Sequence, residues 1–153
     1  MMQEIENVSQ KGWKGPVLAF IAVLLLLAAC SQATSSDPAN VASPPSKNAE
    51  GYTDITVQQL AEMMKDKDLS LVNVHIPYQG DIPETDLSIP FNEIADRLAE
   101  LPGKDAPIVL YCRSGSMSTT AGKVLVSLGY TNVLELDGGM RAWEAAGYEL
   151  LSR

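Results

Sequence analysis

Three short apolar runs, each followed by a loop and a segment with helical spacing, most constrain the fold of this chain. They lie at residues 69–75, 107–111 and 133–136 and are rich in Val, Leu and Ile. Such runs are typical of strands buried on both faces of a sheet. Strands that alternate with helices predict one α/β domain, with a mostly parallel sheet of about five strands and helices on both faces.

Weaker signals complete the predicted element order. Short strands are expected at residues 51–55, just before the first predicted helix, and at residues 86–89, just before Pro90. Thr56 and Gln59 have the spacing of a capping box, which predicts a helix start. Apolar residues at helical spacing predict helices over four segments. These segments are residues 56–64, 91–101, 118–128 and 140–146.

The N-terminal part has the order of an export signal. Lys11 and Lys14 precede an apolar run at residues 17–29, and Cys30 follows. The run is shorter than the roughly 20 residues that span a membrane comfortably. Leu-Ala-Ala-Cys at residues 27–30 resembles the lipobox of bacterial lipoproteins. The resemblance implies that residues 1–29 are a signal peptide and that Cys30 becomes a lipidated N-terminus, with acyl chains such as palmitate.

The expected location follows from that anchor. Residues 30–50 are rich in Ser, Pro and Ala and are expected to form a flexible linker, followed by a folded domain at residues 51–153. Two or more acyl chains would hold the protein on a cell membrane, at its extracytoplasmic (periplasmic or extracellular) face. If Cys30 is lipidated, Cys112 is the remaining thiol of the mature protein, and an internal disulfide is excluded.

Charge narrows the range of partners. The net charge is -8, and the chain has no Lys/Arg run after Cys30. This pattern argues against a nucleic-acid partner. We expect a monomer that needs no cofactor and no metal, since one His and one free Cys do not make a metal site.

The loop after the run at 107–111 carries the chemistry. Cys112 lies where a predicted parallel strand ends, at the edge of the sheet where ligands bind in such folds. The backbone amides that follow it and the start of the next helix favour a thiolate over a thiol. Arg113 adds positive charge, and Gly115 permits a tight backbone path. The expected binding loop consists of Arg113, Ser114, Gly115, Ser116, Met117 and Ser118.

This loop, Cys-Arg-Ser-Gly-Ser-Met followed by Ser, resembles the active-site loop of rhodanese-like sulfurtransferases. Residues 137–148, with Gly-Gly-Met-Arg-Ala-Trp, resemble the closing Gly-Gly-x-x-x-Trp motif of that family. The resemblance covers about residues 52–150 and implies a single rhodanese-like domain. It further implies that Cys112 takes a sulfane sulfur as a persulfide and passes it to a thiol or other thiophilic acceptor. The donor would be a small anion of the thiosulfate or polysulfide type, which Arg113 would help to recruit.

Several positions differ from the family pattern. His75 replaces an Arg at the end of the second strand, Met117 stands where Arg or Thr is common, and residues 80–86 carry additional acidic side chains. These changes weaken the case for thiosulfate as the donor. His75 is expected either to assist the chemistry or, as we favour, to replace the Arg structurally through a hydrogen bond to a nearby loop. Asp137 is a second candidate near the site, through a bond to a loop amide.

Two alternative enzyme classes are excluded by missing residues. A cysteine-dependent phosphatase needs an Arg six residues after its Cys, where this chain has Ser118. A thioredoxin-like oxidoreductase needs a second cysteine close by. One alternative from another class stays open. It is a non-catalytic, rhodanese-fold binding module, tethered in the cell envelope, that uses the acidic segment 81–86 as its contact surface.

Overall fold

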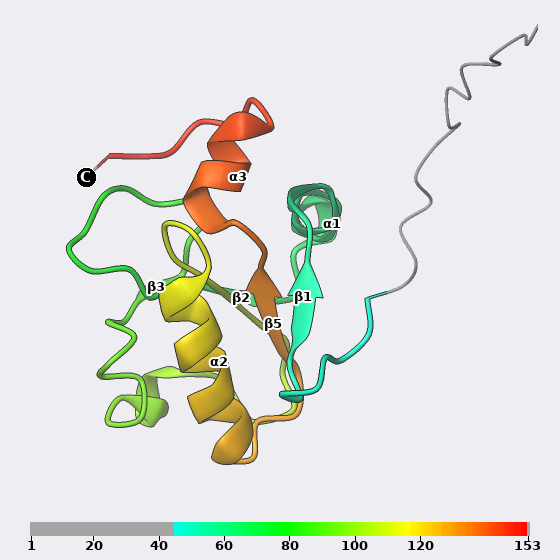
Figure 1. The fold of residues 1–153 in the computed structure, drawn as a ribbon, viewed down its shortest axis with the longest axis vertical. Coiled ribbons are helices and arrows are strands. Elements are labelled where there is room, and N and C mark those ends of the chain that lie inside the picture. The colour runs from blue at the N-terminus through cyan, green and yellow to red at the C-terminus, as the bar shows by residue number, and fades with distance from the viewer. Residues whose placement is uncertain (1–44, 153) are drawn as a thin grey trace, which may run out of the picture. The chain divides into compact units, whose positions relative to one another are not determined.

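The computed structural model describes residues 45–152, which form a five-stranded parallel sheet with helices on both faces (Figure 1). The hydrogen-bonded order of the strands is β1-β5-β4-β2-β3, and every neighbouring pair runs parallel. The strands are β1 (Thr53–Ile55), β2 (Ser70–Asn73), β3 (Leu87–Ser88), β4 (Ile108–Tyr111) and β5 (Val133–Leu136). The prediction of a single α/β domain with a parallel sheet is confirmed.

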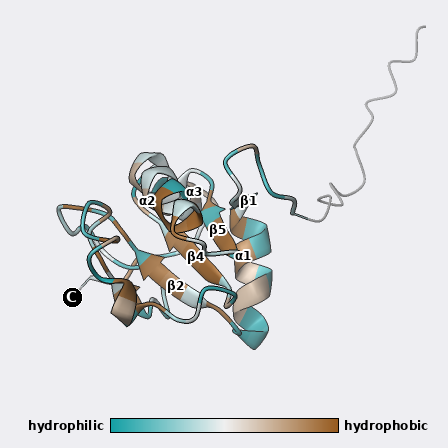
Figure 2. Cartoon of the chain, turned by 90° about the horizontal axis from the view of Figure 1, so that it is seen from below, coloured by the Kyte–Doolittle hydropathy of each residue, from teal (hydrophilic) through white to brown (hydrophobic). Residues whose placement is uncertain are grey.

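Two hydrophobic clusters separate the faces of the sheet. The helices are α1 (Val57–Met63), α2 (Ser116–Ser127) and α3 (Gly139–Ala145), with 3-10 turns η1 (Met64–Asp66) and η2 (Leu98–Glu100). One cluster packs α2 and residues 91–101 on the sheet, and the other packs α1 and α3. Successive strand residues point to opposite faces, so Ile108 and Leu110 join the first cluster and Val109 the second. Figure 2 shows the resulting apolar strands in brown among helices with polar outer surfaces.

The first helix begins as its sequence predicts. The Thr56 hydroxyl accepts a hydrogen bond from the Gln59 amide at 3.2 Å, and the Gln59 side chain accepts one from the Thr56 amide at 2.8 Å. These two bonds satisfy donors that the first turn of a helix leaves without partners. The capping box is therefore confirmed.

The helix predicted at residues 91–101 is wrong. This segment forms successive tight turns that end in η2, with bonds from Glu93 to Pro90 and from Asp96 to Glu93 that span three residues. The Phe91 amide donates instead to the carbonyl of Val74. The apolar spacing nevertheless has the predicted packing role, because Ile94 is buried in the cluster that contains α2. Apolar spacing alone does not distinguish a chain of tight turns from an α-helix.

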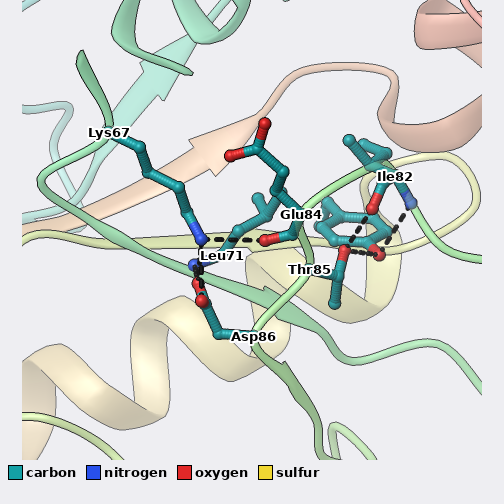
Figure 3. A network of polar contacts seen from close by, with 7 residues as sticks. Lys67, Leu71, Ile82, Glu84, Thr85 and Asp86 are labelled. Carbon is teal, nitrogen blue, oxygen red and sulfur yellow. Dashed lines mark hydrogen bonds and ion pairs between the residues drawn. The ribbon is translucent and has the colours of Figure 1, made fainter. Parts of the chain in front are cut away.

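Acidic side chains in the segment between β2 and β3 bond it to the rest of the domain (Figure 3). The ammonium group of Lys67 contacts the Asp86 carboxylate at 2.7 Å and the carbonyl of Glu84 at 2.8 Å. Asp86 also accepts from the Leu71 amide at 2.8 Å. Asp81 is buried and accepts from the Asn73 side chain at 2.9 Å. These carboxylates are engaged within the domain, which weakens the segment as an acidic contact surface.

The described chain also has contacts before residue 51. Lys47 forms an isolated bridge with Thr53, and its ammonium group donates to the carbonyl of Thr131 at 2.7 Å. The signal-peptide, lipidation and Cys30 predictions lie outside the described residues. In residues 45–152, no helix is long and apolar enough to cross a membrane.

Candidate active site

Cys112 follows directly after Tyr111, the last residue of β4, at the carboxyl edge of the sheet. Its side chain is almost fully buried, with 1% of the residue exposed. The Gly115 amide donates to Sγ at 3.2 Å, and the Ser118 hydroxyl lies 3.4 Å from the same sulfur. Gly115 has a φ of +99° and is the N-cap residue of α2. The loop therefore turns back over its own cysteine, as the glycine predicts.

The hydrogen-bond donors around the Cys112 sulfur lower the pKa of its thiol. Burial raises the pKa of Cys112, but the hydroxyl of Ser118 and the backbone amides of Ser118, Ser114 and Met117 lower it. The hydrogen bonds outweigh burial, and the pKa of the thiol lies below its ordinary value. A thiolate held by several donors is the form in which a cysteine acts as a nucleophile. The structure thus brings Cys112 together with the amides of the predicted binding loop.

The closing motif fixes this loop from the other side. The Met140 amide donates to the Cys112 carbonyl at 2.9 Å, and the Arg141 amide donates to the Arg113 carbonyl at 3.1 Å. A Cβ atom at Gly139 would lie 2.1 Å from the Cys112 carbonyl oxygen, a distance that no real side chain permits. Glycine at 139 therefore lets the start of α3 approach the loop closely enough to donate these bonds.

Arg113 is exposed, unlike the buried Cys112 that precedes it. It lines a small surface pocket of about 260 Å³ together with Gln79, Met140, Glu144 and Leu150. Its carbonyl accepts from the Arg141 amide of α3, and Cys112 is not among the residues that line this pocket. This placement fits the predicted recruitment of an anion better than direct contact with the sulfur.

His75 and Asp137, the two residues predicted to lie near the site, have different surroundings. His75 follows β2, and both of its ring nitrogens are buried without a hydrogen-bond partner among residues 45–152. The hydrogen bond to a nearby loop that we favoured is therefore not formed, although the His75 amide does donate to the Asn73 side chain at 2.9 Å. Asp137 is exposed and lines a different pocket with Thr56 and α3. Within the described chain, no three His, Cys, Asp or Glu side chains form a cluster that could hold a metal ion.

Sequence reasoning missed one residue of the site, Glu135. It is 3% exposed, and its carboxylate lies 2.5 Å from the Ser118 hydroxyl, which in turn contacts the sulfur of Cys112. The one signal in the sequence is a charged residue within an apolar run that is typical of strands buried on both faces. That signal indicates burial of Glu135, but its contact with the cysteine loop appears only in the structure.

Comparison with known proteins identifies the family to which this chain is similar. Residues 56–146 match the family described as the rhodanese-like domain. A sulfurtransferase of Allochromatium vinosum is 37% identical over 103 residues, which cover 65% of this chain and 94% of that protein. The thiosulfate sulfurtransferase GlpE of Pseudoalteromonas translucida is 33% identical over 105 residues, which cover 67% of this chain and 98% of that protein.

Solved structures agree on the fold. A rhodanese-like domain protein from Staphylococcus aureus is 28% identical with a TM-score of 0.55, and the match covers 65% of this chain and 98% of that one. A rhodanese-related protein from Thermoplasma volcanium is 26% identical with a TM-score of 0.56, covering 64% and 96%. The two relatives compared by sequence are both named sulfurtransferases. The match of more than half of the chain, together with the cysteine loop and the Gly-Gly motif that closes on it, shows that this chain belongs to the rhodanese-like domain family.

Proposed function

We propose that this protein is a sulfurtransferase that carries sulfane sulfur as a persulfide on Cys112. The observation that carries the proposal is the set of donors around the sulfur, namely the Gly115 amide, the Ser118 hydroxyl and the other loop amides. The same donors that favour a thiolate would stabilise the negative charge of a persulfide. The kinship with named sulfurtransferases supports this general activity.

The proposed reaction has two displacement steps. In the first, the Cys112 thiolate attacks the outer sulfur of a donor such as thiosulfate. The sulfur–sulfur bond of the donor breaks, sulfite leaves with the electron pair, and a new sulfur–sulfur bond forms on the cysteine. In the second, an acceptor such as cyanide or a thiolate attacks the outer sulfur and releases the Cys112 thiolate. The cycle needs no general base and no external oxidant or reductant.

The donor is a small sulfur-containing anion of the thiosulfate or polysulfide type. The exposed guanidinium of Arg113 beside the loop provides the positive charge that attracts it. His75 stands where the family has an Arg, and Met117 stands where Arg or Thr is common, so the attraction depends more heavily on Arg113. We expect Arg113→Ala to raise the concentration of donor needed for loading more than it slows the transfer from a loaded enzyme.

Sulfur loading tests the proposal directly. The full chain, purified in a mild detergent, is incubated with thiosulfate or polysulfide, and its intact mass is measured before and after cyanide is added. One extra sulfur atom on Cys112, discharged as thiocyanate and absent in Cys112→Ser, is the expected result. Loading from neither donor would reject the sulfurtransferase and favour the non-catalytic binding module.

We further propose that the enzyme works at the extracytoplasmic face of a bacterial membrane, held by lipid on Cys30. The support is the order of Lys11 and Lys14, the apolar run and the Leu-Ala-Ala-Cys sequence. Replacing Cys30 by Ser should leave the precursor unprocessed or release the protein from the membrane fraction. A Cys30→Ser protein that is still processed and membrane-bound would contradict the anchor.

A further inference from the structure

Glu135 is a buried acid beneath the cysteine loop, and the proposed sulfur transfer does not use it. It lies in β5 with 3% of its surface exposed. Its neighbours along the strand, Leu134 and Leu136, belong to the cluster that contains α1 and α3. Because side chains alternate along a strand, Glu135 points to the opposite face, where α2 packs. The loop also closes over it, since a Cβ atom at Gly115 would lie 3.6 Å from its carboxylate.

One hydroxyl joins this carboxyl group to the reactive sulfur. The oxygen of Ser118 lies 2.5 Å from Oε1 of Glu135, 3.4 Å from Sγ of Cys112 and 3.0 Å from the carbonyl oxygen of Gly115. A serine hydroxyl has one proton to donate, so these acceptors compete for it. Ser118 is itself fully buried, so its hydroxyl is shielded from bulk solvent.

The surroundings of Glu135 bring its titration into the neutral range. Burial raises the pKa of the carboxyl group to about 7, opposed by the hydrogen bond from Ser118. Acidic groups on two sides add to the rise, Asp54 on β1 and Asp137 after β5. On the β4 side the titratable neighbour is Cys112, and α2 contributes the neutral Ser118. The carboxyl group therefore changes charge in the neutral range, and the hydrogen bonds around Cys112 lower the pKa of its thiol from the ordinary value toward that range.

We propose that Glu135 is a positioning residue for Cys112, whose carboxyl group determines whether the hydroxyl proton of Ser118 is donated to the sulfur. A neutral Glu135 donates its own proton to the Ser118 oxygen, and the Ser118 proton is then free to bond the thiolate. A charged Glu135 accepts the Ser118 proton in a short, charge-assisted bond, and the thiolate loses that donor. The inference deepens the proposed function, because it assigns control of the sulfur that would carry the persulfide.

The coupling must act in both directions. If charging Glu135 disfavours the thiolate, the thiolate equally disfavours charging of Glu135, and the two groups titrate as a pair. The state suited to sulfur transfer has one proton on Glu135 and none on Cys112. A glutamate that only fastened α2 to β5 through Ser118 would leave the titration of Cys112 unchanged.

The test measures the ionisation of Cys112 against pH in the full chain, without any sulfur donor. Thiolate absorbance, corrected with Cys112→Ser, and the rate of alkylation by iodoacetamide report the same titration. In Glu135→Gln the amide donates to Ser118 as a neutral acid would. We expect its thiolate midpoint to fall by about one pH unit, to a curve for a single proton. Glu62→Gln, an exposed change on α1, is the matched control and should leave the midpoint unchanged.

A double-mutant cycle separates the hydroxyl relay from a simple effect of charge. If Ser118 carries the coupling, Glu135→Gln shifts the midpoint in the native background and has little effect in the Ser118→Ala background. An equal shift in both backgrounds, or no shift in either, would overturn the proposal. Circular dichroism checks that each variant is folded.

Carbon-13 NMR of Glu135 provides a measurement that needs no change to the glutamate. Replacing Cys112 by Ser removes the thiolate, and the titration midpoint of the Glu135 carboxyl should then fall. An unchanged midpoint would overturn the coupling. None of these measurements uses a sulfur donor, so a failure of sulfur loading would reject the proposed function and leave this result standing. Normal loading combined with an uncoupled titration would reject the relay alone.

Discussion

At the scale of single residues, Gly139 controls how closely α3 approaches the cysteine loop. Gly139→Ala places a Cβ atom 2.1 Å from the Cys112 carbonyl oxygen and 3.0 Å from the carbonyl carbon of Arg113. The helix must move away, and the amide bonds to the loop are lost. We expect the free energy of unfolding to fall by about 2–4 kcal/mol and alkylation of Cys112 to slow. Urea unfolding measures the first effect, and Gly103→Ala, which has open space around it, is the control. Equal losses in both variants would contradict this account.

Glu135 gives a second prediction, on stability rather than reactivity. The folded protein holds the Glu135 proton up to a pKa of about 7, whereas an exposed carboxyl releases it near the ordinary 4.5. The unfolded state therefore binds fewer protons in this window, and stability falls as pH rises through it. Glu135→Gln has no carboxyl group at this position, so it lacks this loss of stability with rising pH. Its unfolding free energy relative to the native protein should increase by up to about 3 kcal/mol between pH 4 and pH 8. Urea unfolding at both pH values measures it, and a constant difference would contradict the raised pKa.

Sequence patterns predict Cys112 as the reactive residue but do not predict the role of Glu135. Cys112 can be recognised because a strand end, a glycine and a helix start occur within a few positions of it. Glu135 appears in the sequence as an ordinary polar interruption of an apolar strand. Its role depends on β5 being an inner strand and on Ser118 lying above it, two facts that arise from separate parts of the chain.

At the scale of elements, α1 depends on its cap. Thr56→Ala removes the side-chain oxygen that accepts from the Gln59 amide, and helix caps of this kind are worth about 1 kcal/mol. We expect the urea midpoint to fall accordingly while the Cys112 titration is unchanged, because α1 packs on the sheet face opposite α2. Thr56→Ser keeps the hydroxyl and should retain most of the stability. A Thr56→Ser protein as unstable as Thr56→Ala would assign the effect to the lost methyl group.

The bounds of two elements lie at or close to the predicted residues. The strand at Val133–Leu136 matches its prediction, and α2 begins at Ser116, two residues before the predicted start. The helix expected at residues 91–101 is replaced by turns whose bonds span three residues, and the Phe91 amide ties the start of the segment to the Val74 carbonyl. Tertiary contacts there override a periodicity that also suits tight turns.

At the scale of the whole molecule, the last described residues are tied to the segment that follows β2. Leu151 and Asp81 exchange two backbone hydrogen bonds at 2.7 and 2.8 Å. Asp81 then accepts from the Asn73 side chain, whose oxygen accepts from the His75 amide. A continuous set of bonds thus runs from residue 151 to the end of β2, beside the candidate active site. The alternation of strands and helices predicts the sheet, but no local pattern predicts this link between distant segments.

Shortening the chain tests this link. A protein that ends at Tyr148 loses both bonds between Leu151 and Asp81, and the buried indole of Trp143 loses its acceptor, the Glu149 carbonyl at 3.2 Å. Buried donors left without partners are costly, so the free energy of unfolding should fall by about 2–4 kcal/mol. A protein lacking only Ser152 and Arg153 keeps every one of these bonds and is the control. The urea midpoint should fall in the first protein alone, with an unchanged slope if the rest of the domain still unfolds as one unit. Equal midpoints in the two shortened proteins would show that the link contributes nothing to stability.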